Sequence, residues 1–331
     1  MPRVSKALQS AIVVVLVVAG LAGAILFGMI AFGTSDPPPP LASINSAFEN
    51  MDFSDLPAVE RVPARGGGTI AFRRWNARPA SDQEIPVIAI HGSSGSSVSL
   101  HALAKALSAE GMQVYAPDIR GHGETGRRGD IDYAGQLDDD LEDFVAAVQR
   151  FHPGKRPVLL GSSSGGGFAL HAAASRFGGS FERVVLLSPM LGPQAPTVKD
   201  QGEAWARPFI PRYIGLSVLS GLGIHAFDYL PVIAFAIDPA RASLLAGTYS
   251  FRLLNAFGTS DYAADLKNAR APLQVLAGGK DELFKAEMFA PTVHAIRPGV
   301  PVSIVAGVDH IGMITDPRAV PAIAAALRAG S

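Results

Sequence analysis

The sequence predicts an α/β protein with a mostly parallel sheet, helices on both faces of that sheet, and one transmembrane helix ahead of it. Three observations predict this fold class. From about residue 58, short apolar runs alternate with segments whose apolar residues recur at helical spacing, as in a parallel sheet covered by helices. The chain has 331 residues, enough for one large α/β domain or two smaller ones, with a sizeable core either way. A separate apolar stretch lies near the N-terminus.

That N-terminal stretch, residues 11–32, predicts a membrane anchor. No charged residue occurs between Lys6 and Asp36, and about 20 apolar residues cross a bilayer as a helix. A cleaved signal peptide, usually with a shorter apolar region, and a buried soluble helix are the alternatives. Because Arg3 and Lys6 precede the span, residues 1–10 are expected in the cytoplasm and the rest of the chain in the periplasm or at the cell exterior.

Residues 33–57 are predicted to be a Pro-rich linker, since Pro37–Pro40 favours a stiff, extended spacer. The globular domain is expected to span residues 58–331. Its strands and helices follow in order. An opening hairpin is expected at 58–64 and 69–75. Further strands are expected at 85–92, 113–119, 156–161, 183–189, 272–279 and 301–307. Helices are expected at 97–110, 133–151 and 286–297, with one more after 161 and one closing the chain.

Residues of about 191–271 interrupt this alternation. They include a long apolar stretch with many Pro and Gly residues, which predicts an inserted helical lid. A second membrane-associating segment is the alternative, and Arg212 and Asp228 speak against a true span there.

Composition excludes several function classes. The formal net charge of −1, without a Lys/Arg cluster, argues against a nucleic-acid partner. The chain has no cysteines, which excludes thiol nucleophiles, thiolate metal sites and disulfides. His101, His171 and His225 have no partners at metal-ligand spacing, and no glycine pattern fits a Rossmann or P-loop site, so no metal or cofactor is expected.

The pattern G-x-S-x-G occurs at residues 161–165, directly after an apolar strand and before a helical segment. In that context it is typical of a strained turn that presents a nucleophilic serine, and the central residue is Ser163. Ser162 and Ser164 flank it. A flexible Ser/Gly linker is the alternative, which its place between a strand and a helix disfavours.

A serine nucleophile needs a base oriented by a carboxylate. Asp281 and His310 each follow a predicted strand, so both are expected at the carboxyl edge of the sheet, with Asp281 as acid and His310 as base. Glu282 and Asp309 are alternative acids. The oxyanion formed during attack is expected to bind the backbone N–H groups of Ser164 and of Ser93, in the loop after strand 85–92.

The motifs "HGSSG", "DIRGHGET", "GSSSGG", "GGKDELF" and "DHIGM" resemble the α/β-hydrolase superfamily. The segment from residue 118 to 145 is similar to the monoacylglycerol lipase and lysophospholipase branch. This resemblance implies the α/β-hydrolase fold, an ester-hydrolysing activity, a helical cap, and Ser163, Asp281 and His310 in the roles given above. The chain departs from the branch by having serines on both sides of Ser163 and an aspartate before His310.

The sequence therefore predicts a membrane-anchored serine hydrolase of carboxylic esters, with lipid-derived esters as a candidate class. The expected partners are a small-molecule or lipid ester and the membrane. Two alternatives remain: an acyltransferase or peptidase that uses the same triad, and a non-catalytic binding protein on this fold.

Overall fold

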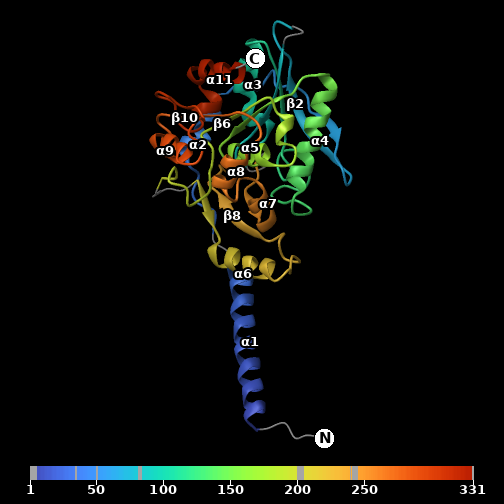
Figure 1. Cartoon of the computed structure of the whole chain (residues 1–331), viewed down its shortest axis with the longest axis vertical. Coiled ribbons are helices and arrows are strands. Elements are labelled where there is room, and N and C mark those ends of the chain that lie inside the picture. The colour runs from blue at the N-terminus through green and yellow to red at the C-terminus, as the bar shows by residue number, and fades with distance from the viewer. Residues whose placement is uncertain are drawn as a thin grey trace.

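A computed structural model describes residues 6–33, 36–49, 51–80, 84–199, 205–238, 240 and 245–329, with side chains from Leu8 onward. A single long helix, α1 (Lys6–Phe32), projects from a globular body, and helix α6 (Ile210–Gly221) runs crosswise where the two meet (Figure 1). Arg3, used to predict topology, lies outside the described residues.

The main sheet has the predicted, mostly parallel architecture. Its order is β1-β2-β4-β3-β5-β6-β10-β11; β2 is antiparallel to both neighbours, and the other neighbouring strands are parallel. The strands are β1 (Glu60–Pro63), β2 (Thr69–Trp75), β3 (Ile85–Ile90), β4 (Met112–Pro117), β5 (Val158–Ser162), β6 (Val184–Leu187), β10 (Leu273–Gly278) and β11 (Val302–Val305).

Helices cover both faces of this sheet because its central strands are apolar on both sides. In β3, Val87 packs on the face covered by α3, α10 and α11, whereas the next residue, Ile88, packs on the face covered by α4, α5 and α9. The bounds of these helices are α3 (His101–Ala109), α4 (Gln136–Phe151), α5 (Ser164–Ala174), α9 (Phe289–His294), α10 (Gly312–Thr315) and α11 (Val320–Arg328). Short 3-10 turns cover Ser46–Phe48, Ser97–Leu100, Gly178–Ser180, Ala286–Met288 and Pro317–Ala319.

The insert is mixed rather than purely helical, which corrects the predicted helical lid. A three-stranded antiparallel sheet combines β7 (Ala206–Pro208), β8 (Pro231–Phe235) and β9 (Thr248–Ser250), and it accompanies α6, α7 (Phe251–Ala256) and α8 (Tyr262–Asn268). The β-branched and aromatic residues of β8 explain the strand, because they fit a pleated, half-buried surface. Residues 200–204, 239 and 241–244 of the predicted lid lie outside the described residues.

Part of the predicted linker, residues 33–57, is folded onto the domain; the extended spacer was expected at Pro37–Pro40, which lie in neither a helix nor a strand. Helix α2 (Ala42–Asn45) lies within it, and Ile44 is a buried core residue. The Asn45 side-chain amide donates to the Ala236 carbonyl of the insert (2.8 Å), and its oxygen accepts from the Asp238 amide (3.0 Å). We call residues 41–53 the strap, excluding Asn50, which lies outside the described residues. Burial of Ile44 and these bonds hold the strap on the domain.

Candidate active site

Ser163 occupies the turn between β5 and α5. Its backbone has φ +55° and ψ −120°, a left-handed conformation that non-glycine residues rarely adopt and that is common at functional turns. The Ser163 amide donates to the Leu187 carbonyl (2.9 Å), and its carbonyl accepts from the Met190 amide (2.9 Å), so neighbouring backbone holds the turn.

The two glycines of the motif allow this turn to form. A Cβ on Gly161 would lie 2.2 Å from the Gly165 carbonyl oxygen, and a Cβ on Gly165 would lie 2.2 Å from the His91 carbonyl oxygen. Both distances are far inside van der Waals contact, so only glycine permits the close approach of β5, α5 and the loop after β3.

Asp281 and His310 form a buried pair at the carboxyl ends of β10 and β11. His310 Nδ1 donates to Asp281 Oδ2 (2.9 Å), and the two residues are 4% and 1% exposed. The other carboxylate oxygen, Oδ1, accepts from the backbone amides of Leu283 and Phe284 (2.9 Å each). The carboxylate is thus fixed from both sides. Because Nδ1 carries the proton, the neutral ring keeps its lone pair on Nε2.

The alternative acids have other partners. Glu282 Oε2 accepts from the His310 backbone amide (3.0 Å), and Asp309 Oδ1 accepts from the Gly312 amide (2.7 Å). Neither contact orients the His310 ring, whereas Asp281 bonds it directly.

Burial and mutual attraction act in opposition on the pKa values of this pair. Burial alone would raise the pKa of Asp281, but the charge and hydrogen bond of His310, with further donors, outweigh it and leave that pKa lowered. Burial likewise would lower the pKa of His310, yet the carboxylate of Asp281 leaves it raised above 6.5. The pair is therefore stabilised as carboxylate and imidazolium.

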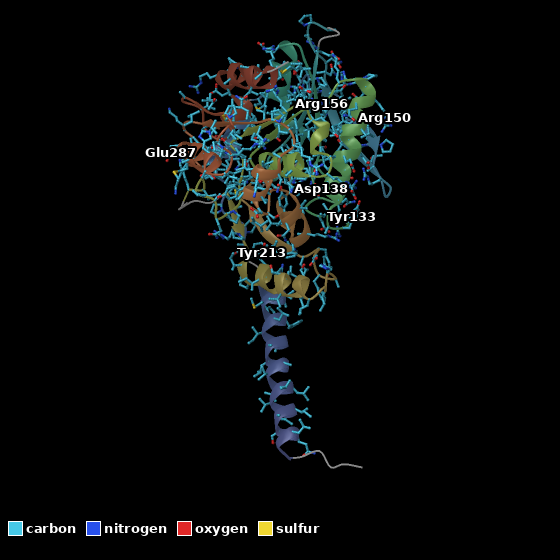
Figure 2. The ribbon with its side chains drawn as sticks, viewed as in Figure 1. Tyr133, Asp138, Arg150, Arg156, Tyr213 and Glu287 are labelled. Atoms are coloured by element: carbon cyan, nitrogen blue, oxygen red, sulfur yellow. The ribbon has the colours of Figure 1, made fainter. Side chains whose placement is uncertain are left out.

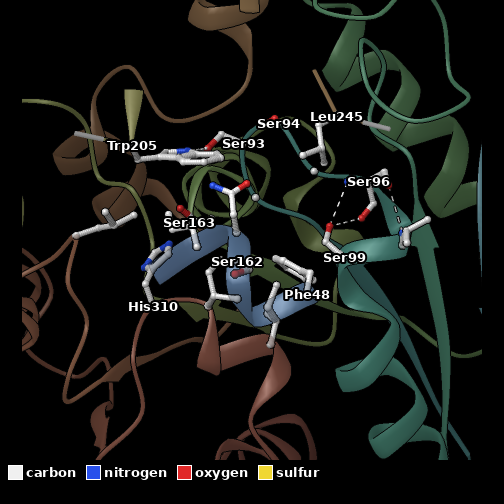
Figure 3. Close-up of a pocket in the computed structure, with 18 of the residues that line it drawn as sticks. Phe48, Ser93, Ser94, Ser96, Ser99, Ser162, Ser163, Trp205, Leu245 and His310 are labelled. Atoms are coloured by element: carbon white, nitrogen blue, oxygen red, sulfur yellow. Dashed lines mark hydrogen bonds between the residues drawn. The ribbon is translucent and has the colours of Figure 1, made fainter. Parts of the chain in front are cut away.

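Ser163 and His310 line the same pocket, together with residues of the loop after β3 and of the strap (Figure 3). This pocket has a volume of about 90 Å³. A cavity of about 480 Å³ also reaches Ser163 and is walled by the insert. Apolar side chains of the insert in that wall include Ile233, Phe235, Leu254 and Phe257. The structure thus brings together a strained serine, a buried Asp–His pair and an apolar cavity.

The two predicted oxyanion donors flank this serine. Ser164 is the first residue of α5, where backbone amides lack partners within the helix. Ser93 lies in the loop after β3 and lines both cavities, and its hydroxyl accepts from the Trp205 indole nitrogen (2.9 Å). The predicted donors therefore lie on two different segments beside Ser163, the first turn of α5 and the loop after β3.

A buried hydrogen-bond chain fixes the Ser93 loop to the insert. Ser94 has φ +66°, and its amide donates to the Tyr249 hydroxyl of β9 (2.6 Å). That hydroxyl donates to His122 Nε2 (2.5 Å), because His122 Nδ1 donates to the Ile119 carbonyl (3.0 Å). Burial lowers the pKa of His122 and keeps its ring neutral. A neutral ring is what this series of hydrogen bonds requires, because Nε2 must accept from the Tyr249 hydroxyl.

His91 is also a structural group of this region. Its Nδ1 donates to the Gly92 carbonyl (2.8 Å), and its Nε2 accepts from the Ile119 amide (3.2 Å). Both ring nitrogens are engaged with backbone, so His91 holds the loop after β3 against the segment at Ile119. Sequence reasoning missed Tyr249 and Trp205, since nothing in their local pattern indicates contact with a loop more than a hundred residues away.

A comparison with known proteins assigns the chain to a family. A sequence profile described as serine aminopeptidase, S33 (Hydrolase_4) matches residues 82–297, well over half of the chain. The chain belongs to the serine aminopeptidase S33 family. This S33 family chain is 31% identical over 230 residues to a monoacylglycerol lipase of Mycolicibacterium smegmatis, covering 66% of this chain and 77% of that protein. It is 26% identical over 240 residues to the monoglyceride lipase of Homo sapiens, covering 71% and 76%.

A solved structure confirms the α/β-hydrolase fold of this S33 family chain. A soluble variant of monoglyceride lipase from Saccharomyces cerevisiae, in complex with a substrate analog, superposes with a TM-score of 0.62 at 17% sequence identity, covering 82% of this chain and 95% of that chain. The S33 profile and the lipase relatives together identify the chain as a serine hydrolase of the esterase type.

Proposed function

We propose that the protein is a membrane-anchored serine hydrolase that cleaves lipid-derived carboxylic esters, with Ser163 as nucleophile, His310 as base and Asp281 as orienting acid. The observation that carries this proposal is the convergence of the strained Ser163 turn and the buried Asp281–His310 pair on one pocket. Those three side chains supply the nucleophile, the base and the orienting acid that acyl transfer to a serine requires.

The reaction follows from the tautomer of His310. Its Nε2 takes the Ser163 hydroxyl proton as the serine oxygen attacks the ester carbonyl, and Asp281 stabilises the imidazolium. The backbone amides of Ser93 and Ser164 bind the developing oxyanion. His310 returns the proton to the departing alcohol, leaving an acyl-enzyme. Water, deprotonated by His310 in turn, attacks the acyl carbonyl, and His310 returns this proton to the Ser163 oxygen as the carboxylic acid leaves.

The large cavity supports a lipid-derived substrate. Its walls of Ile233, Phe235, Leu254 and Phe257 would accept an acyl chain, since apolar surface leaves water favourably. The relatives at 31% and 26% identity carry the names monoacylglycerol lipase and monoglyceride lipase, which points to the same substrate class.

The N-terminal helix supports an uncleaved anchor. Residues Leu8–Phe32 form a helix long and apolar enough to span a membrane, and none of its span is buried within the protein, unlike a soluble core helix. Arg212 of the insert donates to the Ile30 carbonyl at the helix end (2.8 Å), a contact that cleavage would remove. With Arg3 and Lys6 ahead of the span, the catalytic domain would lie outside the cytoplasm.

A fluorophosphonate probe tests the proposed nucleophile. The full chain, purified in detergent, is treated with the probe and mapped by peptide mass spectrometry. We expect an adduct on Ser163 that is absent from Ser163→Ala and His310→Ala. An adduct on Ser162 or Ser164 would contradict the assignment, and no adduct on folded protein would favour a non-catalytic role. Product analysis with monoacylglycerols, amide substrates and alcohol acceptors then separates ester hydrolysis from peptidase or acyltransferase chemistry.

A further inference from the structure

Helix α6 carries an exposed apolar stripe on the outside of the insert. Ile210, Ile214 and Val218 follow one another at intervals of four residues and so share one side of the helix, and Leu222, the residue after its end, continues this spacing. Their side chains are between 47% and 71% exposed. A soluble domain rarely leaves such a contiguous apolar stripe in water without a partner.

The loop after α6 extends this surface. Ile224, Phe227 and Tyr229 are exposed as well, whereas the described part of the chain outside α1 and residues 210–229 has three exposed large hydrophobic side chains: Tyr133, Phe151 and Ile304. The two formally charged residues within 210–229, Arg212 and Asp228, are both buried. The surface is therefore apolar and free of exposed formal charge, apart from any contributed by His225.

The stripe lies where α1 meets the body. Gly33 at the end of α1 approaches Arg212 so closely that a Cβ would lie 2.5 Å from the Arg212 amide nitrogen, and a Cβ on Gly215 would lie 2.8 Å from Ile30 Cγ1. The Arg212 guanidinium donates to the Ile30 carbonyl (2.8 Å) and also to the Pro231 carbonyl (3.1 Å). Arginine here binds the partially negative carboxyl end of α1 and ties it to the insert.

The length of α1 sets the depth in a membrane at which its contact with α6 would lie. The 20 residues from Leu8 to Phe27 rise about 30 Å along the helix, which matches the hydrocarbon thickness of a bilayer of about 30 Å. The next residues are those that contact α6. Since α6 runs crosswise to α1, it would lie along the membrane plane just where the hydrocarbon ends (Figure 1).

We infer that the apolar stripe of α6 and the loop after it are a second membrane contact, seated in the boundary between headgroups and acyl chains of the leaflet that α1 enters. This inference rests on the proposal that α1 spans the membrane. Burial of these side chains in lipid is favourable for the same reason that core burial is. The contact holds the insert, whose residues wall the large cavity, against the surface from which a lipid ester would come.

Depth-dependent quenching tests the contact in the full chain. Because the chain has no cysteines, single variants Val218→Cys, Leu222→Cys, Leu16→Cys and Arg150→Cys each take one fluorophore. The labelled proteins are reconstituted in phosphatidylcholine vesicles that carry a nitroxide either near the headgroup or deep in the acyl chain. Arg150 is the matched control, because it lies in the body, away from α1, while Tyr213 marks the α6 side (Figure 2). Hydrolysis of a soluble ester checks that each labelled protein is folded.

We expect the Val218 and Leu222 labels to lose fluorescence mainly to the shallow nitroxide, the Leu16 label to the deep one, and the Arg150 label to neither. A second substitution, Leu222→Asp, should reduce quenching at Val218, whereas the control Ile304→Asp, at another exposed apolar position away from α6, should not. If Leu16 is quenched but Val218 and Leu222 behave like Arg150, the second contact is refuted and the anchor stands. Shielding of Val218 by another copy of the chain, without quenching, refutes it too. An unquenched Leu16 label would refute the anchor itself.

Discussion

The core and the insert contribute to the candidate site in different ways. Ser163, Asp281 and His310 all follow strands of the main sheet, and backbone contacts hold them, such as the Leu283 and Phe284 amides on Asp281. The insert supplies the cavity wall, the Tyr249 hydroxyl and the joint to α1 through Arg212. The difference teaches that the proposed catalytic groups belong to the core, whereas the insert forms the cavity wall and the contact with α1. Substitutions in the core and in the insert, together with the pH dependence of activity, separate these two contributions.

The largest effect is expected at the nucleophile. Ser163→Ala should lower kcat/KM for an ester by about four orders of magnitude or more, because the acyl-enzyme cannot form. The free energy of unfolding should change little, since the half-buried hydroxyl is not a core group. Ester hydrolysis and thermal unfolding measure the two quantities. Activity retained within tenfold would show that Ser163 is not the nucleophile.

Next comes the packing of the turn. Gly165→Ala places a Cβ 2.2 Å from the His91 carbonyl oxygen, and we expect it to lower the free energy of unfolding by about 3 kcal/mol. The matched control in the insert is Gly221→Ala, where a Cβ meets no atom within 4 Å. Because alanine has a higher helix propensity than glycine, this control should leave the free energy of unfolding unchanged or raise it by up to about 1 kcal/mol. Equal losses at both positions would contradict the contrast between a tight core and an open insert edge.

The connection between the two regions is probed at Tyr249. Tyr249→Phe removes the hydroxyl that accepts from the Ser94 amide and donates to His122, leaving both buried groups unpaired. We expect kcat to fall by about tenfold with little change in KM, because the loop that carries an oxyanion donor loses its support. Tyr213→Phe is the control, since that hydroxyl binds Asn255 at an exposed site. A KM effect alone would argue for a substrate-binding role instead.

The pH dependence of activity reports on the core pair. Its partner Asp281 leaves the pKa of His310 raised above 6.5, and a protonated ring cannot accept the serine proton. Activity should therefore fall as the pH drops through this raised pKa, by about tenfold per pH unit below it. The acidic limb of kcat/KM should lie above pH 6.5, and Asp281→Asn should move it down. A wild-type limb below pH 6.5 would contradict the pairing.

The same pair links stability to pH. Because the folded pKa of His310 is raised, its contribution is full below the unfolded pKa and is lost as the pH rises through the folded one. The lowered pKa of Asp281 acts in the opposite range, since its contribution is lost as the pH falls through that value.

The smallest effect is expected at the strap. Phe48 lines the pocket of Ser163 and His310, so Phe48→Ala should shift the preference among ester chain lengths by a few-fold while leaving the nucleophile labelled by the probe. Ser43→Ala, at an exposed strap position, is the control. An unchanged chain-length profile would show that the strap does not shape the site.

Local patterns in the sequence determined the fold class and the order of the core strands and helices along the chain. Alternating apolar runs and the Gly161–Gly165 spacing depend on near neighbours and on backbone geometry, so they can be read without the fold. The same patterns predicted Ser163, Asp281 and His310, and the structure brings Asp281 and His310 into a hydrogen bond. Their catalytic roles stay predictions.

Only the tertiary structure decided the rest. The strap lies in the predicted linker, yet Asn45 bonds Ala236, nearly two hundred residues away. The insert was predicted as helical, yet β8 pairs with β7 and β9, which precede and follow it along the insert. In the sequence, Arg212 made a second membrane-spanning segment unfavourable because of its charge. In the structure, it binds the end of α1. These contacts join segments remote in sequence, and their energy depends on which surfaces dock, which no local pattern encodes.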